Sequence, residues 1–137
     1  MSGFWIYSFI TALLVPLILM LCGYLLYYKT PKKINGFYGY RTKMSRKNQK
    51  TWDFANRYCG RVWMLMGSGM LPVSVLCMKL VVDADVDTIG MWNGILVTIQ
   101  CVIMILAVPL TERALRKNFD AYGIKKNNKN NPDYIKL

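Results

Sequence analysis

The sequence contains no histidine and only one glutamate, Glu112. Histidine is the most common general base and the most common protein ligand of zinc. Its absence argues against an ordinary hydrolase or a zinc enzyme. The four cysteines form no Cys-x-x-Cys pair and have no metal-ligand spacing. We therefore expect a protein that is not an enzyme, with no metal and no cofactor.

Charge is also missing from three long stretches of the chain: Phe4–Tyr28, Val62–Met78 and Thr88–Thr111. A helix needs about 20 apolar residues to cross a bilayer. The middle stretch is short, but Lys79 can snorkel and residues 80–82 can extend it. The sequence therefore predicts an all-α membrane protein with three transmembrane helices, over residues 4–28, 62–82 and 88–111. We expect polar residues within them, such as Asn93 and Gln100, to hydrogen-bond neighbouring helices.

The basic residues are concentrated in two segments of the chain. Between Lys29 and Arg61 the only acidic residue is Asp53, and the segment after the third span is also basic. The connection between the second and third spans instead carries three aspartates: Asp83, Asp85 and Asp87. The positive-inside rule places the N-terminus and this acidic connection outside and the C-terminus in the cytoplasm. The net charge of +11 is then a cationic rim beside the lipid bilayer, and we expect no direct nucleic-acid binding.

The first connection, residues 31–61, is not an ordinary solvated loop. Gly36 and Gly39 bracket two aromatic residues, which predicts a tight turn. Ser45 is a suitable helix N-cap. From there, residues recur at helical spacing and include Trp52, which suits a membrane interface. We expect an ordered amphipathic cytoplasmic loop or helix between spans one and two, which lies on the membrane or runs straight into span two.

The connection contains an ordered series of residues: Pro31, Asn35, Gly39, Tyr40, Arg41, Thr42, Ser45, Asn48, Trp52, Ala55 and Asn56. This series resembles the signature of the SdpI-type family of small bacterial membrane proteins. The resemblance is strongest between Pro31 and Gly69 and weaker toward the end of the chain, where Glu112 belongs to it. From the residues that carry it, we take nine as the candidate toxin-, partner- or lipid-binding motif: Asn35, Gly39, Tyr40, Arg41, Thr42, Ser45, Asn48, Trp52 and Asn56.

The resemblance implies immunity against a secreted, membrane-active antimicrobial peptide toxin, in a multi-pass protein of the bacterial cell membrane. It also implies, as a second role, sequestration of a cytoplasmic repressor at the membrane. Some members have more spans than this chain, which leaves room for a homo-oligomer. Alternative functions are a lipid-phosphate-binding membrane enzyme and an accessory subunit of a membrane complex.

Two groups of residues have competing interpretations. Arg41 lies among glycine, tyrosine and threonine, where its guanidinium can bind a phosphate or carboxylate, or clamp the loop's own carbonyls or Asp53. The outer loop contains three aspartates: Asp83, Asp85 and Asp87. They can bind a cation, contact a cationic toxin, or have no role beyond the absence of positive charge that is typical of outer loops. We expect residues 1–123 to form a single three-span domain and residues 124–137 to form a polar, disordered tail.

Overall fold

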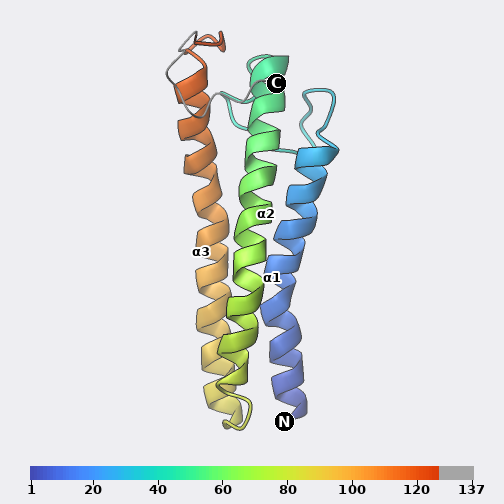
Figure 1. Ribbon diagram of the computed structural model, residues 1–137, viewed down its shortest axis with the longest axis vertical. Coiled ribbons are helices and arrows are strands. Elements are labelled where there is room, and N and C mark those ends of the chain that lie inside the picture. The colour runs from blue at the N-terminus through green and yellow to red at the C-terminus, as the bar shows by residue number, and fades with distance from the viewer. Residues whose placement is uncertain (127–137) are drawn as a thin grey trace. The chain divides into compact units, whose positions relative to one another are not determined.

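The computed structural model describes residues 1–126 and contains three helices. They are α1 (Gly3–Tyr28), α2 (Gln49–Lys79) and α3 (Val86–Asn118), and Figure 1 shows them in chain order from blue to red. All three are long and apolar enough to cross a membrane. The predicted all-α membrane protein with three helical spans is therefore confirmed at this level. The predicted tail falls mostly on residues 127–137, which lie outside the described residues.

The helices expose apolar side chains in the manner of lipid-facing surfaces. Along α1, for example, Ile10, Leu17 and Leu21 are at least half exposed. Such a surface is favourable in hydrocarbon, where no water penalises exposed apolar groups, whereas backbone polar groups must be satisfied inside the helix. The arrangement agrees with a multi-pass membrane protein.

The described chain divides into two compact units, each containing part of every helix. Unit 1 comprises Met1–Cys22 and Trp63–Ile105. Its core includes Trp5, Met78 and Ile89, and the Trp5 indole donates a hydrogen bond of 2.8 Å to the carbonyl of Met78. A buried indole N–H usually has such a partner. This bond fixes the start of α1 against the end of α2.

Polar side chains inside unit 1 link its helices, as expected from the sequence. Asn93 donates to the hydroxyl of Thr11 at 3.0 Å. Gln100 donates to the hydroxyl of Ser74 at 2.7 Å and to the carbonyl of Ala12 at 3.0 Å. Both amides thus join α3 to another helix, which confirms the prediction that they serve helix association.

Within the described residues, unit 2 comprises Gly23–Val62 and residues 106–126. Phe54 and Phe119 pack edge to face with ring centroids 5.5 Å apart. Gly60 allows α2 to approach α1, because a Cβ there would lie 2.6 Å from the carbonyl oxygen of Gly23. All basic residues of the described chain except Lys79 belong to this unit. The candidate motif lies entirely within it.

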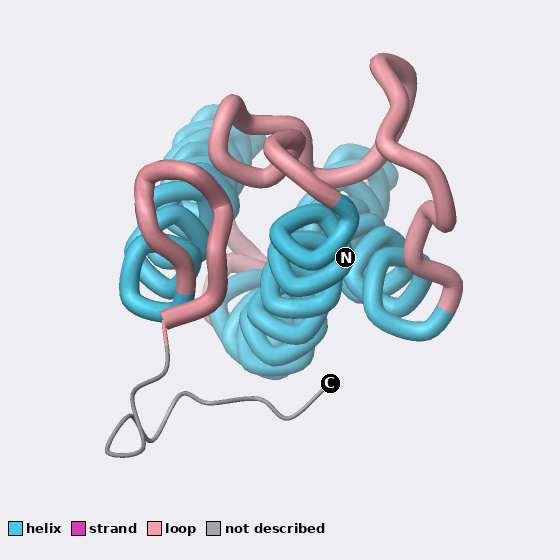
Figure 2. The backbone as a smooth tube through the Cα atoms, turned by 90° about the horizontal axis from the view of Figure 1, so that it is seen from above, coloured by secondary structure: helices cyan, strands magenta, loops and turns pink. Residues whose placement is uncertain are grey.

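The boundaries of α2 differ from the predicted second span. The helix begins at Gln49, well before the apolar run, and residues 80–82 form a turn rather than a helical extension. Residues 29–48 contain no helix and form the long loop between α1 and α2 in Figure 2. A separate amphipathic helix on the membrane is therefore absent from this connection, and its helical part continues into α2. The expectation of one domain over residues 1–123 stays a prediction.

Candidate functional site

The site begins where α2 begins, and Asn48 sets this point. The Asn48 side-chain oxygen accepts a hydrogen bond of 2.9 Å from the Thr51 amide, and the Thr51 hydroxyl accepts one of 3.1 Å from the Asn48 amide. This reciprocal pair is a capping box, in which two helix-end amides are satisfied at once. The side-chain Nδ2 of Asn48 donates to the carbonyl of Gly123 at 2.7 Å, so the cap is joined to the segment after α3.

Ser45 is not the N-cap of α2, and that prediction is wrong. Its hydroxyl accepts a 2.8 Å hydrogen bond from the Thr42 amide, and the Thr42 hydroxyl accepts one of 3.2 Å from the Ser45 amide. The two side chains close a turn of their own just before the helix. Both Ser45 and Asn48 have the chemistry of a cap, and the capping box at Thr51 decides between them.

Trp52 anchors the preceding loop on α2. Its side chain has no exposed surface, and its indole donates a hydrogen bond of 2.7 Å to the carbonyl of Pro31. The ring is therefore enclosed by the protein, and its expected position at the depth of a membrane interface stays a prediction. An amphipathic ring suits an interface, but it suits a buried site equally well when a carbonyl is available for its N–H.

Asn56, one helical turn further along α2, holds the loop at Tyr40. Its side-chain oxygen accepts from the Tyr40 amide at 2.7 Å, and its nitrogen donates to the carbonyl of Trp52 at 2.9 Å. Gly39 makes this approach possible. It has a φ of 104°, and a Cβ there would lie 2.7 Å from the Asn56 oxygen and 3.3 Å from the Trp52 ring. Both the backbone angle and the space at this position require glycine.

Tyr40 connects the loop to α3. Its hydroxyl lies 2.9 Å from a carboxylate oxygen of Glu112 and 3.1 Å from the carbonyl oxygen of Val108. Burial of the ring, reinforced by the neighbouring Glu112 carboxylate, raises the pKa of the Tyr40 phenol above its ordinary value. Tyr40 is therefore a neutral donor to the only glutamate in the protein. The sequence placed Glu112 in the resemblance but gave no sign that it meets Tyr40.

A second part of the motif is exposed. The Asn35 side-chain oxygen accepts from the amides of Phe37 and Tyr38, at 3.0 and 2.9 Å. The Arg41 guanidinium donates to the carbonyl of Gly36. These bonds fold residues 35–41 into a turn that leaves Phe37 91% exposed. Of the two interpretations of Arg41, the contacts match a clamp on the loop's own carbonyl, and Asp53 is instead bonded to Gln49.

The motif thus has two parts, which we name by their residues. The buried layer consists of the buried residues Pro31, Tyr40, Trp52 and Asn56, together with Gly39 and Glu112, which are half-buried beside them. The exposed layer consists of Asn35, Gly36, Phe37, Tyr38 and Arg41. Thr42, Ser45 and Asn48 connect the two to the start of α2. The sequence did not identify Phe37 or Thr51 as site residues, although Gly36 and Gly39 on either side of Phe37 predicted the turn.

The acidic connection has one aspartate with a local structural role. Asp85 precedes α3 and accepts hydrogen bonds from the Thr88 hydroxyl at 2.6 Å and the Thr88 amide at 3.1 Å. These bonds lower the pKa of the Asp85 carboxyl. Asp83 and Asp87 are exposed beside it. Across residues 1–126, no three aspartates or other ligating side chains gather closely enough to hold a metal, so the cation-site interpretation finds no geometric support.

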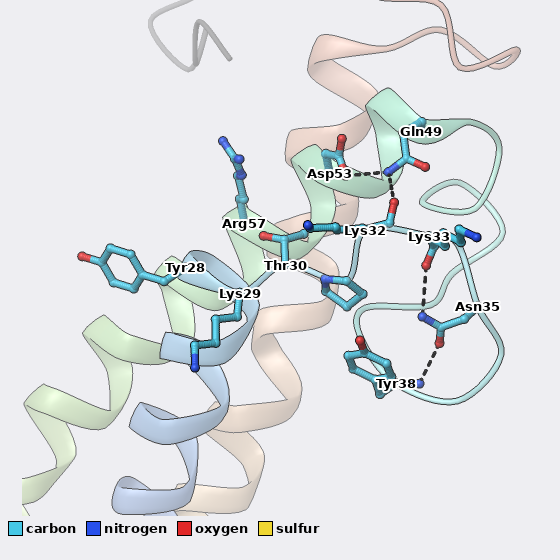
Figure 3. Close-up of a pocket in the computed structure, with 11 residues that line it drawn as sticks. Tyr28, Lys29, Thr30, Lys32, Lys33, Asn35, Tyr38, Gln49, Asp53 and Arg57 are labelled. Atoms are coloured by element: carbon cyan, nitrogen blue, oxygen red, sulfur yellow. Dashed lines mark hydrogen bonds between the residues drawn. The ribbon is translucent and has the colours of Figure 1, made fainter.

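An open pocket of about 870 Å³ lies beside the exposed layer. The end of α1, the following loop and the first turns of α2 line it, and Figure 3 shows the labelled side chains from these three segments. Four of them are basic: Lys29, Lys32, Lys33 and Arg57. The only acidic residue among them is Asp53. Arg41 does not line this pocket.

The fold and the site together define a membrane protein with helical spans and a hydrogen-bonded motif between its first two helices. Residues 32–111 match the SdpI/YfhL protein family, and the chain belongs to this family. It is 31% identical over 99 residues to the uncharacterized protein YfhL of Bacillus subtilis strain 168, an alignment that covers 72% of this chain and 80% of the relative. No solved structure matches the chain.

Proposed function

We propose that the protein confers immunity against a secreted, membrane-active peptide toxin. The observation that carries this proposal is membership of the SdpI/YfhL family, a family known for immunity, with a match that includes the whole candidate motif from Asn35 to Asn56. The three spans fit the proposal, because the threatened structure is the membrane itself. The protein acts in this proposal by binding and not by catalysis, which agrees with the absence of histidine.

The proposed orientation has the N-terminus outside and the C-terminus in the cytoplasm of a bacterial cell. Its support is the distribution of charge: unit 2 contains nearly all the basic residues, and the connection in unit 1 carries Asp83, Asp85 and Asp87. With this orientation, a toxin arriving from outside first meets the acidic connection. Asp83 and Asp87 are the available carboxylates there, because Thr88 engages Asp85. A cationic peptide is the matching partner.

Sequestration of a cytoplasmic repressor is a second candidate role, and the exposed layer favours it. Phe37 is almost fully exposed at the tip of a turn that Asn35 and Arg41 hold in shape. Aromatic residues and arginine are both enriched at protein–protein interfaces. In this role the exposed layer is the cytoplasmic contact, and the buried layer holds it in place.

A survival assay tests the proposal. The protein is expressed in a toxin-sensitive bacterial strain, which is then exposed to a panel of cationic, membrane-active peptides. Protection against at least one peptide, with no protection from the empty vector, is the expected result. Equal killing of both strains across the panel, with the protein shown to be inserted in the membrane, would contradict the proposal.

Variants of the acidic connection test whether its aspartates contact the toxin or only contribute to the orientation of the protein in the membrane. Asp83→Asn with Asp87→Asn removes the two available carboxylates, and Asp85→Asn removes the one that caps α3. Under the proposal, the double variant raises sensitivity to a cationic peptide more than the single variant does. Cysteine labelling of residues in this connection from the outside of intact cells establishes the orientation in the same strains.

A further inference from the structure

The pocket beside the exposed layer is lined by more basic than acidic residues. Lys29, Lys32, Lys33 and Arg57 line it against a single carboxylate, Asp53. None of the four basic side chains makes an ion pair within residues 1–126. Arg57 lies one helical turn from Asp53, yet the carboxylate accepts its hydrogen bond from Gln49 at 2.8 Å instead. The pocket therefore keeps its positive charge for something outside the chain.

The walls of this pocket are fixed by hydrogen bonds. Gln49 joins the first turn of α2 to the loop, because its amide donates both to Asp53 and, at 2.9 Å, to the carbonyl of Lys32. Asn35 donates to the carbonyl of Lys33 at 3.1 Å and accepts from the Tyr38 amide. Figure 3 shows these bonds around the pocket. The backbone that carries the cations is thus ordered before any ligand arrives, which lowers the entropic cost of binding.

The place of the pocket along the chain indicates the membrane surface. Tyr28 is the last residue of α1 and lines the pocket, and Lys29 follows directly after the apolar run. Lipid phosphates lie just outside the hydrocarbon, at the depth where a spanning helix ends. On the same side of α1, the exposed rings of Tyr24 and Tyr28 pack with centroids 4.8 Å apart. An apolar surface for an acyl chain therefore leads up to the cations.

We propose that this pocket binds the phosphate headgroup of an anionic phospholipid, through Lys29, Lys32, Lys33 and Arg57. Guanidinium and ammonium groups both bind phosphate oxygens, the former with two parallel hydrogen bonds. A free phosphate offers the same charge, but it leaves the exposed Tyr24 and Tyr28 rings without a partner. The bound lipid fixes the loop before α2 at the membrane surface. The site is independent of the proposed immunity role.

Spin-labelled lipids measure the binding directly. The full-length protein is placed in nanodiscs, and its association with spin-labelled phosphatidylglycerol is compared with that of spin-labelled phosphatidylcholine. The pocket variant is Lys29→Gln with Arg57→Gln. The matched control is Lys50→Gln with Arg46→Gln, which removes one Lys and one Arg from exposed positions outside the pocket.

Each cation near the surface contributes about fivefold to anionic-lipid binding, so the loss of two would lower the preference for phosphatidylglycerol about 25-fold without screening. Because salt screens part of this attraction, the expected fall in the pocket variant is roughly tenfold. The control keeps most of the preference. Equal loss in both variants would show only a diffuse positive surface and would overturn the proposal. The absence of any preference in the unmodified protein would overturn it as well.

Two further measurements complete the test. The first shows whether the ligand is a lipid or a free anion, and the second shows whether the loss of binding in the pocket variant reflects the site itself or a folding defect. Inorganic phosphate at millimolar concentration leaves the lipid preference unchanged under the proposal, and displacement of the lipid would identify free phosphate as the ligand instead. Asp53→Asn removes the only acidic group of the pocket and keeps the acceptor for Gln49. This variant binds phosphatidylglycerol more tightly than the unmodified protein, a gain that misfolding cannot produce. A weakened preference in this variant contradicts the proposal.

Discussion

The buried and exposed layers of the motif use similar residues for opposite purposes. In the buried layer, Asn56 and Trp52 hold Tyr40 and Pro31 through hydrogen bonds that have no contact with solvent. In the exposed layer, Asn35 and Arg41 make equally specific bonds, but these surround an almost fully exposed Phe37. The first layer therefore stabilises the fold, and the second shapes a surface. Substitutions in the buried layer should therefore lower the stability of the fold, whereas substitutions in the exposed layer should lower function without lowering stability.

Gly39→Ala should have the largest effect on stability. The alanine would occupy a φ of 104° and bring its Cβ within 2.7 Å of the Asn56 oxygen, so we expect a loss of about 3 kcal/mol in the free energy of unfolding. SDS titration of the purified protein in mixed micelles measures this loss. The matched control is Gly36→Ala, because Gly36 has no neighbour within 4 Å and no positive φ. Equal losses in the two variants would contradict the account of Gly39.

Asn56→Ala comes next, because it removes a fully buried side-chain amide that makes two hydrogen bonds. The Tyr40 amide loses its acceptor, and an unsatisfied buried group costs about 1–3 kcal/mol. We expect a loss of about 2 kcal/mol in the same titration. Asn35→Ala makes the same chemical change at an exposed site, where water replaces the lost bonds, and should cost much less. A greater loss for Asn35→Ala would reverse the assignment of the two layers.

Tyr40→Phe removes one hydroxyl and should cost about 1 kcal/mol, since Glu112 loses its donor while the ring stays in place. Tyr38→Phe is the control, because Tyr38 belongs to the exposed layer. Thermal unfolding followed by tryptophan fluorescence compares the two variants. A Tyr38→Phe variant that melts lower than Tyr40→Phe would be the contrary outcome.

The raised pKa of Tyr40 adds a dependence on alkaline pH. In the unfolded chain a tyrosine ionises near pH 10, whereas burial and Glu112 keep Tyr40 neutral in the folded protein. The resulting stabilisation is fully present below pH 10 and is lost progressively as the pH rises beyond it. We predict a steeper fall in melting temperature above pH 10 for the unmodified protein than for Tyr40→Phe. Identical profiles would show that Tyr40 ionises normally.

The sequence predicted the spans well, because a long uncharged run has few alternatives to a membrane helix. It also predicted an ordered loop from the glycines around Phe37. It failed at Ser45 because two residues with capping chemistry stand three positions apart, and only the contact with Thr51 selects Asn48. It did not reveal the burial of Trp52, because an amphipathic ring has the same sequence signal at an interface and in a buried site. The Tyr40–Glu112 contact joins residues distant in the chain, and no local pattern encodes it.

The smallest effect on stability and the largest on function should come from Arg41→Ala. Its bond to the Gly36 carbonyl is exposed, so we expect a loss below about 0.5 kcal/mol, as is usual for surface substitutions. Phe37→Ala should behave in the same way. The matched control is Arg46→Ala, an exposed arginine outside both layers. SDS titration should place all three close to the unmodified protein.

Survival of a sensitive strain that expresses these variants tests the division of the motif most directly. The assay counts surviving cells after peptide exposure at equal amounts of membrane-inserted protein. If protection requires the cytoplasmic contact of the exposed layer as well as the outer carboxylates, the unmodified protein and Arg46→Ala protect fully, and Arg41→Ala and Phe37→Ala lose protection; this is the result that we predict. Full protection by the last two variants would contradict a functional role for the exposed layer.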